Sequence, residues 1–205
     1  MVLAILAFSF ASSRQRLLTA QAIVDNRWLE EELADSLAHA ECLASRDPLT
    51  GLMNRRAFFE CAKDQACGKT RYLLTIDLDH FKSINDRFGH PVGDKVLIAL
   101  SEIMRDILRD ISGDDHCAVR MGGEEFVMVI GHGNEEFVGL VAERLRLAIS
   151  MIGSEIGPEG LDTSASIGMC RWNGETSIDD VLSRADKALY RAKERGRNLV
   201  VSDAA

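Results

Sequence analysis

The sequence has few of the residues that mark disulfide-stapled, fibrous or disordered proteins. Only 3 of its 205 residues are proline, and no low-complexity segment or internal repeat is present. Its 5 cysteines form no CxxC pair and no even framework, so we expect reduced thiols within a core and a reducing compartment. The length therefore indicates one globular domain with an appendage.

The sequence also lacks an excess of positive charge. A formal net charge of −8 argues against a large nucleic-acid footprint, because such a footprint needs many Lys and Arg side chains near phosphates. We therefore expect no nucleic-acid partner. A single nucleotide held by a local cluster of cations and a metal ion is still compatible with this charge.

A long membrane-spanning run is absent, although the chain begins with an apolar stretch. Residues 1–11 read MVLAILAFSFA, which is shorter than the roughly 20 residues that a bilayer requires. Arg14 and Arg16 follow it, and no basic start or cleavage site of a secretory signal is seen. Three interpretations stay open: an amphipathic helix start, a dimer contact, or the end of a membrane segment. The last would tether a cytoplasmic domain to the inner face of the cell membrane.

Residues 15–45 contain no Gly or Pro, and apolar residues recur in them every three or four positions. This stripe consists of Leu18, Ala22, Leu29, Leu33, Leu37, Ala40 and Ala44. It predicts a short, imperfect coiled coil that joins two chains, since a lone helix before the globular part would expose it. A helix packed on its own domain is the alternative. Pro48 and Gly51 end the helix, so we expect a stalk over residues 1–46 and a domain over 47–205.

The strongest local signal is a pair of strand-like runs joined by two glycines. Residues 120–126 read RMGGEEF, and Gly122 and Gly123 predict a tight hairpin turn. Glu124 and Glu125 come next, although acids are poor strand material. Because successive strand residues point to opposite faces, the two acids should have different roles. This conflict with local rules suggests a site, although a solvated acidic rim would also explain the motif alone.

A second acidic stretch lies upstream. Residues 72–78 read YLLTIDL and predict a buried strand with Asp77 near its end. Asp77 and Asp79 share a face, and a buried carboxylate there needs a partner such as a metal ion or a cation. Asp77 offers oxygen to a hard divalent cation, and the backbone at the strand end can add a carbonyl.

The segment after this strand contains the parts of a nucleotide site. Backbone N–H groups of the turn can cradle phosphates, and Lys82 can neutralise them. Asn85 offers a donor and an acceptor, whereas Asp94, just inside the helix that runs to about Asp110, offers acceptors alone. Together these two side chains fit the edge of a guanine base.

The remaining pattern predicts a mixed α+β fold. Helices are expected over 55–67, 134–152 and 177–194, and strands over 161–172 and 198–202, which gives a βαββαβ core with additions. Lys193 and Arg197 flank Gly196, a predicted helix C-cap. Basic groups at a helix end are commonly dipole partners, but here they can also reach phosphates.

These segments resemble GGDEF-domain diguanylate cyclases, with the signature in its GGEEF form, over about residues 47–201. The substrate segment is similar at residues 77–82 (DLDHFK), 85–86, 89–90 and 93–94, and the signature hairpin at 120–126. Residues 47–52 (DPLTGL), 185–193 (ADKALYRAK) and 196–198 resemble the opening and closing motifs. Several long motifs in the right order make the resemblance specific.

The resemblance implies a palm-like α+β fold, in which helices flank a mostly antiparallel sheet. It also implies a nucleotidyltransferase of bacterial signalling that condenses two GTP molecules into cyclic di-GMP and two pyrophosphates. Each domain of a homodimer would bind one GTP, and each 3′-hydroxyl would attack the α-phosphate of the other.

The resemblance also implies roles for individual residues. Two Mg²⁺ or Mn²⁺ ions per site would be held by Asp77, the Leu78 carbonyl and Glu124. Glu124 and Glu125 are the expected essential acids, and the resemblance leaves open which one assists deprotonation of the hydroxyl. The substrate-binding residues implied are Phe81, Lys82, Asn85, His90, Asp94, Gly123, Lys193 and Arg197.

Two positions depart from the family pattern. Met121 stands where an aromatic residue is usual, which should be tolerated because Met packs flexibly. Gly113 and His116 stand at the two key positions of an Arg-x-x-Asp inhibitory product site, so we predict no product inhibition there.

The alternatives to an active diguanylate cyclase are a catalytically silent GTP-binding module and a cyclase that makes a 3′,5′-cyclic mononucleotide. The intact GGEE hairpin argues against both.

Overall fold

The computed structural model describes residues 28, 32, 44–64, 70–113, 115–174 and 176–203, with main chain alone at 63 and 64. The apolar N-terminal run, and all of the predicted coiled coil except residues 28, 32, 44 and 45, therefore lie outside the described residues. Within the described ranges, no helix is both long enough and apolar enough to cross a membrane. The chain divides into two units, Met1–Ala44 and Ser45–Ala205, and the second unit is the one considered below.

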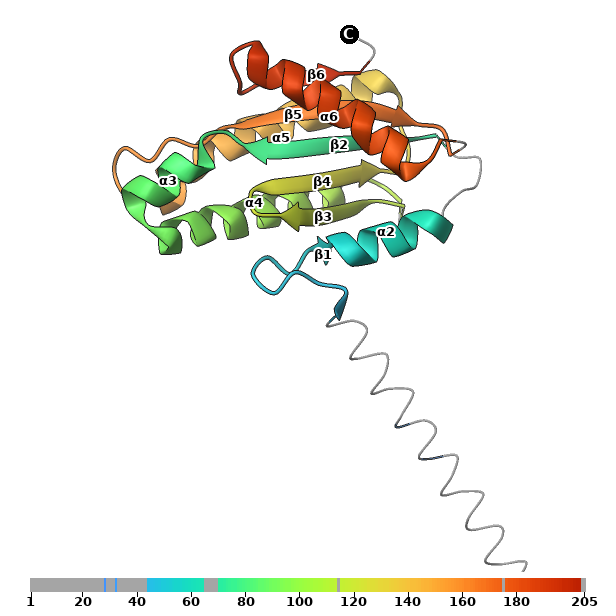
Figure 1. Cartoon of the computed structure of the whole chain (residues 1–205), viewed down its shortest axis with the longest axis horizontal. Coiled ribbons are helices and arrows are strands. Elements are labelled where there is room, and N and C mark those ends of the chain that lie inside the picture. The colour runs from blue at the N-terminus through green and yellow to red at the C-terminus, as the bar shows by residue number, and fades with distance from the viewer. Residues whose placement is uncertain are drawn as a thin grey trace, which may run out of the picture. The chain divides into compact units, whose positions relative to one another are not determined.

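One six-stranded sheet forms the centre of this unit, with the strand order β1-β3-β4-β2-β5-β6 (Figure 1). The four inner strands are antiparallel, whereas the short edge strands β1 and β6 pair in parallel with β3 and β5. The strands are β1 Met53–Asn54, β2 Arg71–Leu78, β3 Cys117–Gly122, β4 Glu125–Ile130, β5 Ala165–Trp172 and β6 Val200–Ser202. The sheet is mostly antiparallel, as predicted. The two-residue strand β1 was not predicted, because so short a strand leaves no recognisable pattern in the sequence.

Helices cover both faces of the sheet (Figure 1). They are α2 Arg55–Asp64, α3 Phe81–Phe88, α4 His90–Asp110, α5 Glu135–Ile156 and α6 Ile178–Glu194. Alternate residues of β2 enter two different cores. Leu74 and Ile76 belong to the cluster formed with α4 and α5, whereas Leu73 packs with Phe58 of α2 and Val181 of α6. By the two-residue period of a strand, Asp77 shares the α2/α6 face with Leu73.

Polar side chains cap the starts of three helices. The side chain of Asn54 accepts a hydrogen bond from Ala57 N at 2.9 Å, and that of Asn134 accepts one from Phe137 N at 2.9 Å. Ser177 Oγ accepts one from Asp180 N at 3.1 Å. These bonds satisfy amides that have no partner within their own helix. Gly196 follows α6 with φ +115°, as the predicted C-cap requires.

Three free cysteines are described, and they differ in environment. Cys170 is buried and Cys117 half-buried, but Cys61 is exposed on α2, which corrects the expectation of a core position for that thiol. Burial raises the pKa of Cys117 to about 11. Burial, reinforced by the neighbouring Asp203 carboxylate, raises the pKa of Cys170 to about 12.

These environments predict unequal thiol reactivity in the folded protein. At pH 8 a thiol with a pKa near 12 is thiolate in only about 0.01% of molecules, so Cys170 should resist iodoacetamide while the accessible Cys61 is alkylated. Peptide mass spectrometry after a timed reaction measures both sites, with denatured protein as the control for full labelling. Equal modification of Cys61 and Cys170 in the native protein would contradict these environments.

Candidate active site at the ends of β2 and β4

The predicted hairpin joins β3 to β4. Arg120 pairs with Phe126, the register then shifts by a bulge, and Gly122 pairs with Glu125. Gly122 has φ +145° and Gly123 has φ +53°, conformations that L-residues with a side chain rarely adopt. No atom lies within 4 Å of a Cβ built at either glycine. The backbone conformation, rather than lack of space, is therefore the reason for glycine in this turn.

Arg120 ties the hairpin turn to the opening DPLTGL motif. Its Nε and Nη2 donate to the Gly123 carbonyl at 3.0 and 2.9 Å, and its Nη1 donates to Asp47 Oδ1 at 3.0 Å. The same Asp47 oxygen accepts from Thr50 N at 2.8 Å and Thr50 Oγ1 at 2.7 Å. Burial alone would raise the pKa of Asp47, but the bonds from Thr50 and Arg120 outweigh it, and the pKa is lowered. The opening motif thus holds the signature turn in place.

The lowered pKa of Asp47 gives a testable dependence of stability on pH. The carboxylate stabilises the fold above its unfolded pKa of about 3.9, and this contribution is lost as pH falls through the lower folded value. At pH 7, Asp47→Asn should cost about 1–3 kcal/mol in urea unfolding, because it weakens charge-assisted bonds, and the gap to the parent should narrow below about pH 4. Asp106→Asn is the control, since its ion pair with Arg109 is largely exposed. A gap independent of pH would contradict this assignment.

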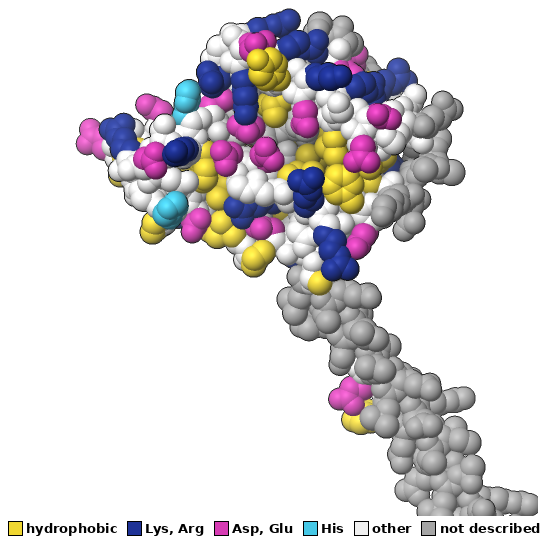
Figure 2. All heavy atoms as spheres, viewed as in Figure 1, with side chains coloured by type: hydrophobic (Ala, Val, Ile, Leu, Met, Phe, Trp, Pro, Cys, Tyr) yellow, Lys and Arg dark blue, Asp and Glu magenta, His cyan; other side chains and the backbone are white. Residues whose placement is uncertain are grey.

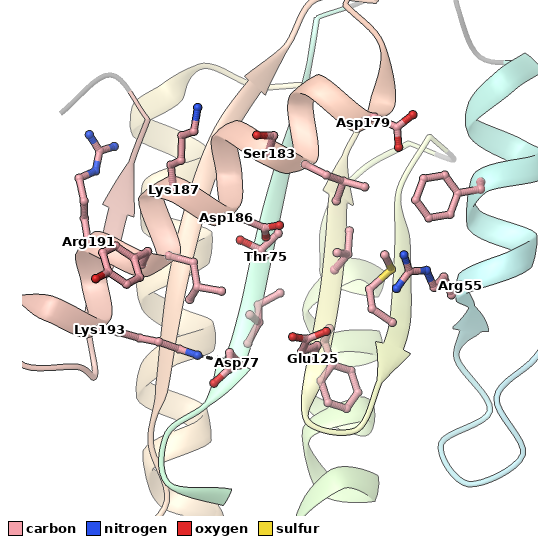
Figure 3. A pocket seen from close by; sticks show the side chains of 18 residues that line it. Arg55, Thr75, Asp77, Glu125, Asp179, Ser183, Asp186, Lys187, Arg191 and Lys193 are labelled. Atoms are coloured by element: carbon pink, nitrogen blue, oxygen red, sulfur yellow. Dashed lines mark ion pairs between the residues drawn. The ribbon is translucent and has the colours of Figure 1, made fainter.

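Two carboxylates face each other across β2 and β4. Asp77 and Glu125 are register partners, and both line a cavity of about 890 Å³ between the sheet, α2 and α6 (Figure 3). Lys193 reaches from the end of α6 and places its Nζ 2.8 Å from Asp77 Oδ2. Figure 2 shows this face, with apolar side chains between α2 and α6 and acidic groups beside them. The arrangement brings three predicted site residues together from three separate elements.

The Asp77 carboxyl is subject both to burial and to neighbouring charges of both signs. Burial is the main reason that its pKa is raised, and the charges of Glu124 and Asp79 raise it further, whereas Lys193 lowers it. The net shift is upward because the cost of burying the charged carboxylate outweighs the ion pair with Lys193. A further positive charge beside Asp77 would stabilise its ionised form.

Glu124 and Glu125 occupy different environments, but Glu124 lies in the turn and β4 begins at Glu125, so strand alternation is not the reason. Glu125 is exposed and lines the cavity opposite Asp77. Glu124 is half-buried, and its carbonyl accepts a hydrogen bond from Leu78 N at 3.4 Å. The hairpin turn and the end of β2 are thus joined through Glu124 and Leu78, the two residues expected beside Asp77 in a metal site.

A second group of predicted residues lies on α3 and α4. Asn85 is half-buried, whereas Lys82, His90 and Asp94 are exposed. A Cβ built at Gly93 would lie 2.0 Å from Asn85 Oδ1 and 3.2 Å from the Phe81 ring. Gly93 therefore provides the space that the Asn85 side chain occupies between the two helices.

Phe81 can offer a ligand its main chain but not its ring. Its side chain is buried in the core beneath α3, with 7% of its surface exposed. Only its main chain is therefore available to a phosphate, along with the neighbouring amide of Lys82. These are the first amides of α3, which have no acceptor within the helix. A phosphate bound here would therefore meet these backbone groups, as the sequence suggests, and not the ring.

Asp79 also differs from expectation, because its partners are neutral. It is 5% exposed, Ser166 donates to its Oδ1 at 2.8 Å, and Ser164 donates to its Oδ2 at 2.8 Å. The backbone N–H of Asn198 donates to the same Oδ2 at 3.0 Å. Neither a metal ion nor a cation is needed to satisfy this carboxylate. Sequence reasoning missed these contacts, since their partners lie 85 or more residues away.

The residues present are compatible with a divalent cation. In the described part of the chain no three His, Cys, Asp or Glu side chains gather closely enough to hold an ion by themselves. Asp77, Glu124 and the Leu78 carbonyl would instead form a mixed oxygen set, the donor type that Mg²⁺ and Mn²⁺ prefer. The Lys193 ammonium group, 2.8 Å from Asp77 Oδ2, shows that this carboxylate accepts a positively charged partner.

The two positions that correspond to the family's inhibitory product site are occupied by Gly113 and His116, which have structural roles in this chain. His116 Nδ1 accepts from Gly131 N at 3.0 Å, so its Nε2 carries the hydrogen and faces the Ser112 carbonyl at 3.0 Å. Gly113 has φ +103° and no side chain. His116 thus fastens the loop before β3 to the end of β4, and the absence of product inhibition at this position stays a prediction.

The mixed sheet, flanked by helices and carrying an acidic edge, defines a palm-like α+β domain. Residues 44–199 match the family described as "Diguanylate cyclase, GGDEF domain", and the chain belongs to this family.

Named relatives and solved structures agree with this assignment. The chain is 36% identical over 178 residues to diguanylate cyclase DgcM of Escherichia coli, covering 84% of this chain and 41% of that protein. It is 41% identical over 160 residues to DgcP of Pseudomonas aeruginosa, covering 76% of this chain and 23% of that protein. The chain thus spans less than half the length of these relatives.

Among solved structures, the coiled coil and GGDEF domain of DgcB from Caulobacter crescentus, in complex with c-di-GMP, is similar with a TM-score of 0.75. The identity is 29%, covering 88% of this chain and 96% of that one. The active GGEEF domain of a Vibrio cholerae diguanylate cyclase is similar with a TM-score of 0.63 and 33% identity, covering 74% of this chain and 97% of that one.

Proposed function

We propose that this chain condenses two GTP molecules into cyclic di-GMP and two pyrophosphates, one GTP being bound by each of two facing domains. The observation that carries this proposal is the pairing of Asp77 with Glu125 across β2 and β4, with Lys193 on Asp77. Membership of the diguanylate cyclase family supports it. Phosphoryl transfer depends mainly on positioning and charge neutralisation, and this site offers both.

The proposed binding roles divide between two groups of residues. Asn85 and Asp94 would read the guanine edge between α3 and α4, with His90 beside them. The phosphates would meet the first amides of α3, Lys82, Lys193, Arg197 and the Gly123 turn. In the structure the Lys193 ammonium group pairs with the Asp77 carboxylate. When a nucleotide binds, this ammonium group would move to the phosphates.

Asp77, Glu124 and the Leu78 carbonyl are the residues that would hold the ions, with two Mg²⁺ or Mn²⁺ per site. Bound there, divalent ions would supply charge for the attacking and leaving oxygens. Glu125 faces the same cavity and would accept or steer the proton of the 3′-hydroxyl. Replacing Glu125 by Gln or Ala therefore tests a role in proton transfer that is separate from metal binding.

A domain with half of a reaction centre needs a second copy. We propose that residues 1–46 form a dimerising stalk and residues 47–205 the catalytic domain, located in the cytoplasm. Linking two domains in this way raises their effective concentration for each other. The apolar run at residues 1–11 suggests a further alternative, in which the stalk is attached to a membrane.

Incubation of the purified protein with GTP and Mg²⁺, with chromatography of the products, tests this proposal. We expect cyclic di-GMP and pyrophosphate, and their loss on chelation of the metal. A 3′,5′-cyclic mononucleotide as product would instead identify a mononucleotide cyclase. Binding of GTP by a confirmed dimer with no turnover would identify a silent module.

A further inference from the structure

The turn after α6 has an unusual backbone. Gly196, Arg197 and Asn198 have φ values of +115°, +67° and +46°, so two consecutive residues with side chains are left-handed. Each such residue costs roughly 1–2 kcal/mol, and Asn tolerates the conformation better than most. Conformations of this kind persist where surrounding contacts fix them, and they are frequent at ligand sites.

Three contacts from three elements fix this turn. Arg197 N donates to the Ala192 carbonyl at 3.0 Å, which anchors the turn to α6. Asn198 N donates to Asp79 Oδ2 at 3.0 Å, which anchors it to the end of β2. Arg146 of α5 donates through Nη1 to Asn198 Oδ1 at 2.9 Å. These contacts engage the main chain and Asn198, and the Arg197 side chain is exposed.

Asp79 is the centre of this arrangement. It lies two residues after Asp77, it is 5% exposed, and Ser164 and Ser166 of the β5 region fix the orientation of its carboxylate. The end of β2 is thus bonded to the last turn of α6, through Asp77 to Lys193, and to the turn that follows α6, through Asp79 to Asn198. The distance from the metal-binding edge to the turn is therefore fixed before any ligand binds.

We infer that Asp79 is a positioning residue for Arg197, supported from the opposite side by Arg146. This inference rests on the proposed function, in which Arg197 binds the phosphates of GTP. A guanidinium group on a turn fixed in advance loses less freedom when it binds a phosphate, so affinity depends on the contacts that hold the turn. Asp79 acts through Arg197 and touches neither nucleotide nor metal ion.

Binding of 3′-deoxy-GTP with Mg²⁺ tests the inference, because this nucleotide lacks the attacking hydroxyl and is not consumed when it is present alone. Asp79→Ala should weaken its binding about tenfold, with little effect on 3′-deoxy-GMP, which lacks the terminal phosphates. Asp79→Asn should restore most of the affinity, since its amide can accept from Ser164 and Asn198 while donating to Ser166. Arg146→Met, which leaves Asp79 intact, should act in the same direction by about threefold.

Thr163→Val is the matched control for loss of a buried polar group nearby. Thr163 is 7% exposed, donates to the Ile149 carbonyl at 2.7 Å and accepts from Gly153 N at 3.1 Å. This substitution should lower the melting temperature but leave both nucleotide affinities at parent values. A selective loss of triphosphate affinity in Thr163→Val would overturn the inference.

A double-mutant cycle with Arg197→Ala completes the test. If Asp79 acts through Arg197, adding Asp79→Ala to Arg197→Ala should produce no further loss of 3′-deoxy-GTP affinity. Additive losses, or equal losses for the two nucleotides, would overturn the positioning role. If Asp79→Ala binds 3′-deoxy-GTP as the parent does while Arg197→Ala binds it weakly, the positioning role of Asp79 is overturned and the phosphate-binding role of Arg197 stands. Unchanged affinity in Arg197→Ala would instead remove Arg197 from the proposed function.

Discussion

Glu125→Gln should lower the rate of cyclic di-GMP formation by about 10³-fold while leaving the affinity for GTP close to that of the parent. Glu125 lies opposite Asp77 on β4 and lines the same cavity, whereas the residues proposed to bind guanine lie on α3 and α4. The amide keeps the shape of the side chain and removes its charge. A change confined to kcat would therefore assign Glu125 to the chemical step.

Asp179→Asn is the matched control for this experiment. Asp179 lines the same cavity from the first turn of α6, but it lies at the far end from Asp77 (Figure 3). Its variant should retain activity within about threefold, with a stability change of less than about 1 kcal/mol from the helix dipole. Equal losses in the two variants would show that the charge of the whole cavity matters rather than the position of Glu125.

Gly93→Ala should reduce the affinity for GTP by about 10- to 100-fold, although it adds a single methyl group. A Cβ at this position would meet Asn85 Oδ1 at 2.0 Å, and Asn85 would have to leave the place from which it is proposed to read guanine. Overpacking between α3 and α4 should also cost about 1–3 kcal/mol of stability. Calorimetric titration with GTP and a urea unfolding curve measure the two effects separately.

Gly139→Ala provides the comparison for Gly93→Ala. Gly139 is also helical, on α5, and a Cβ built there has no atom within 4 Å. The substitution should stabilise the protein by up to about 1 kcal/mol, as expected for Gly to Ala within a helix, and leave GTP binding unchanged. If Gly93→Ala behaved in the same way, the close approach of Asn85 to Gly93 would not control the binding site.

Much of the fold could be predicted because local signals agree with the final structure. The glycine pair fixes the hairpin through positive φ values, and the apolar run before Asp77 predicts the central strand β2. Capping residues such as Asn54 mark the start of a helix through one short hydrogen bond. Each of these features depends on residues close together in the sequence, which a pattern can reveal.

The contacts that organise the site could not be predicted in this way. Arg120 meets Asp47 across 73 positions, and Asn198 meets Asp79 across 119. No spacing rule connects residues so far apart, because their contact depends on how β2 and β3 are placed in the sheet and on how α6 packs against it. The burial of Phe81 is a further example, since a motif shows which residue is present but not which way it faces.

The central claim is that two GTP molecules react with each other across two half-sites. The most direct measurement is the product formed from an equimolar mixture of GTP and 3′-deoxy-GTP with Mg²⁺, analysed by mass spectrometry. The 3′-hydroxyl of GTP should attack the α-phosphate of the deoxy nucleotide and release one pyrophosphate, after which the ring cannot close. A linear dinucleotide should therefore accumulate beside cyclic di-GMP. A mixture that yields only a cyclic mononucleotide, or no dinucleotide of either kind, would contradict the account.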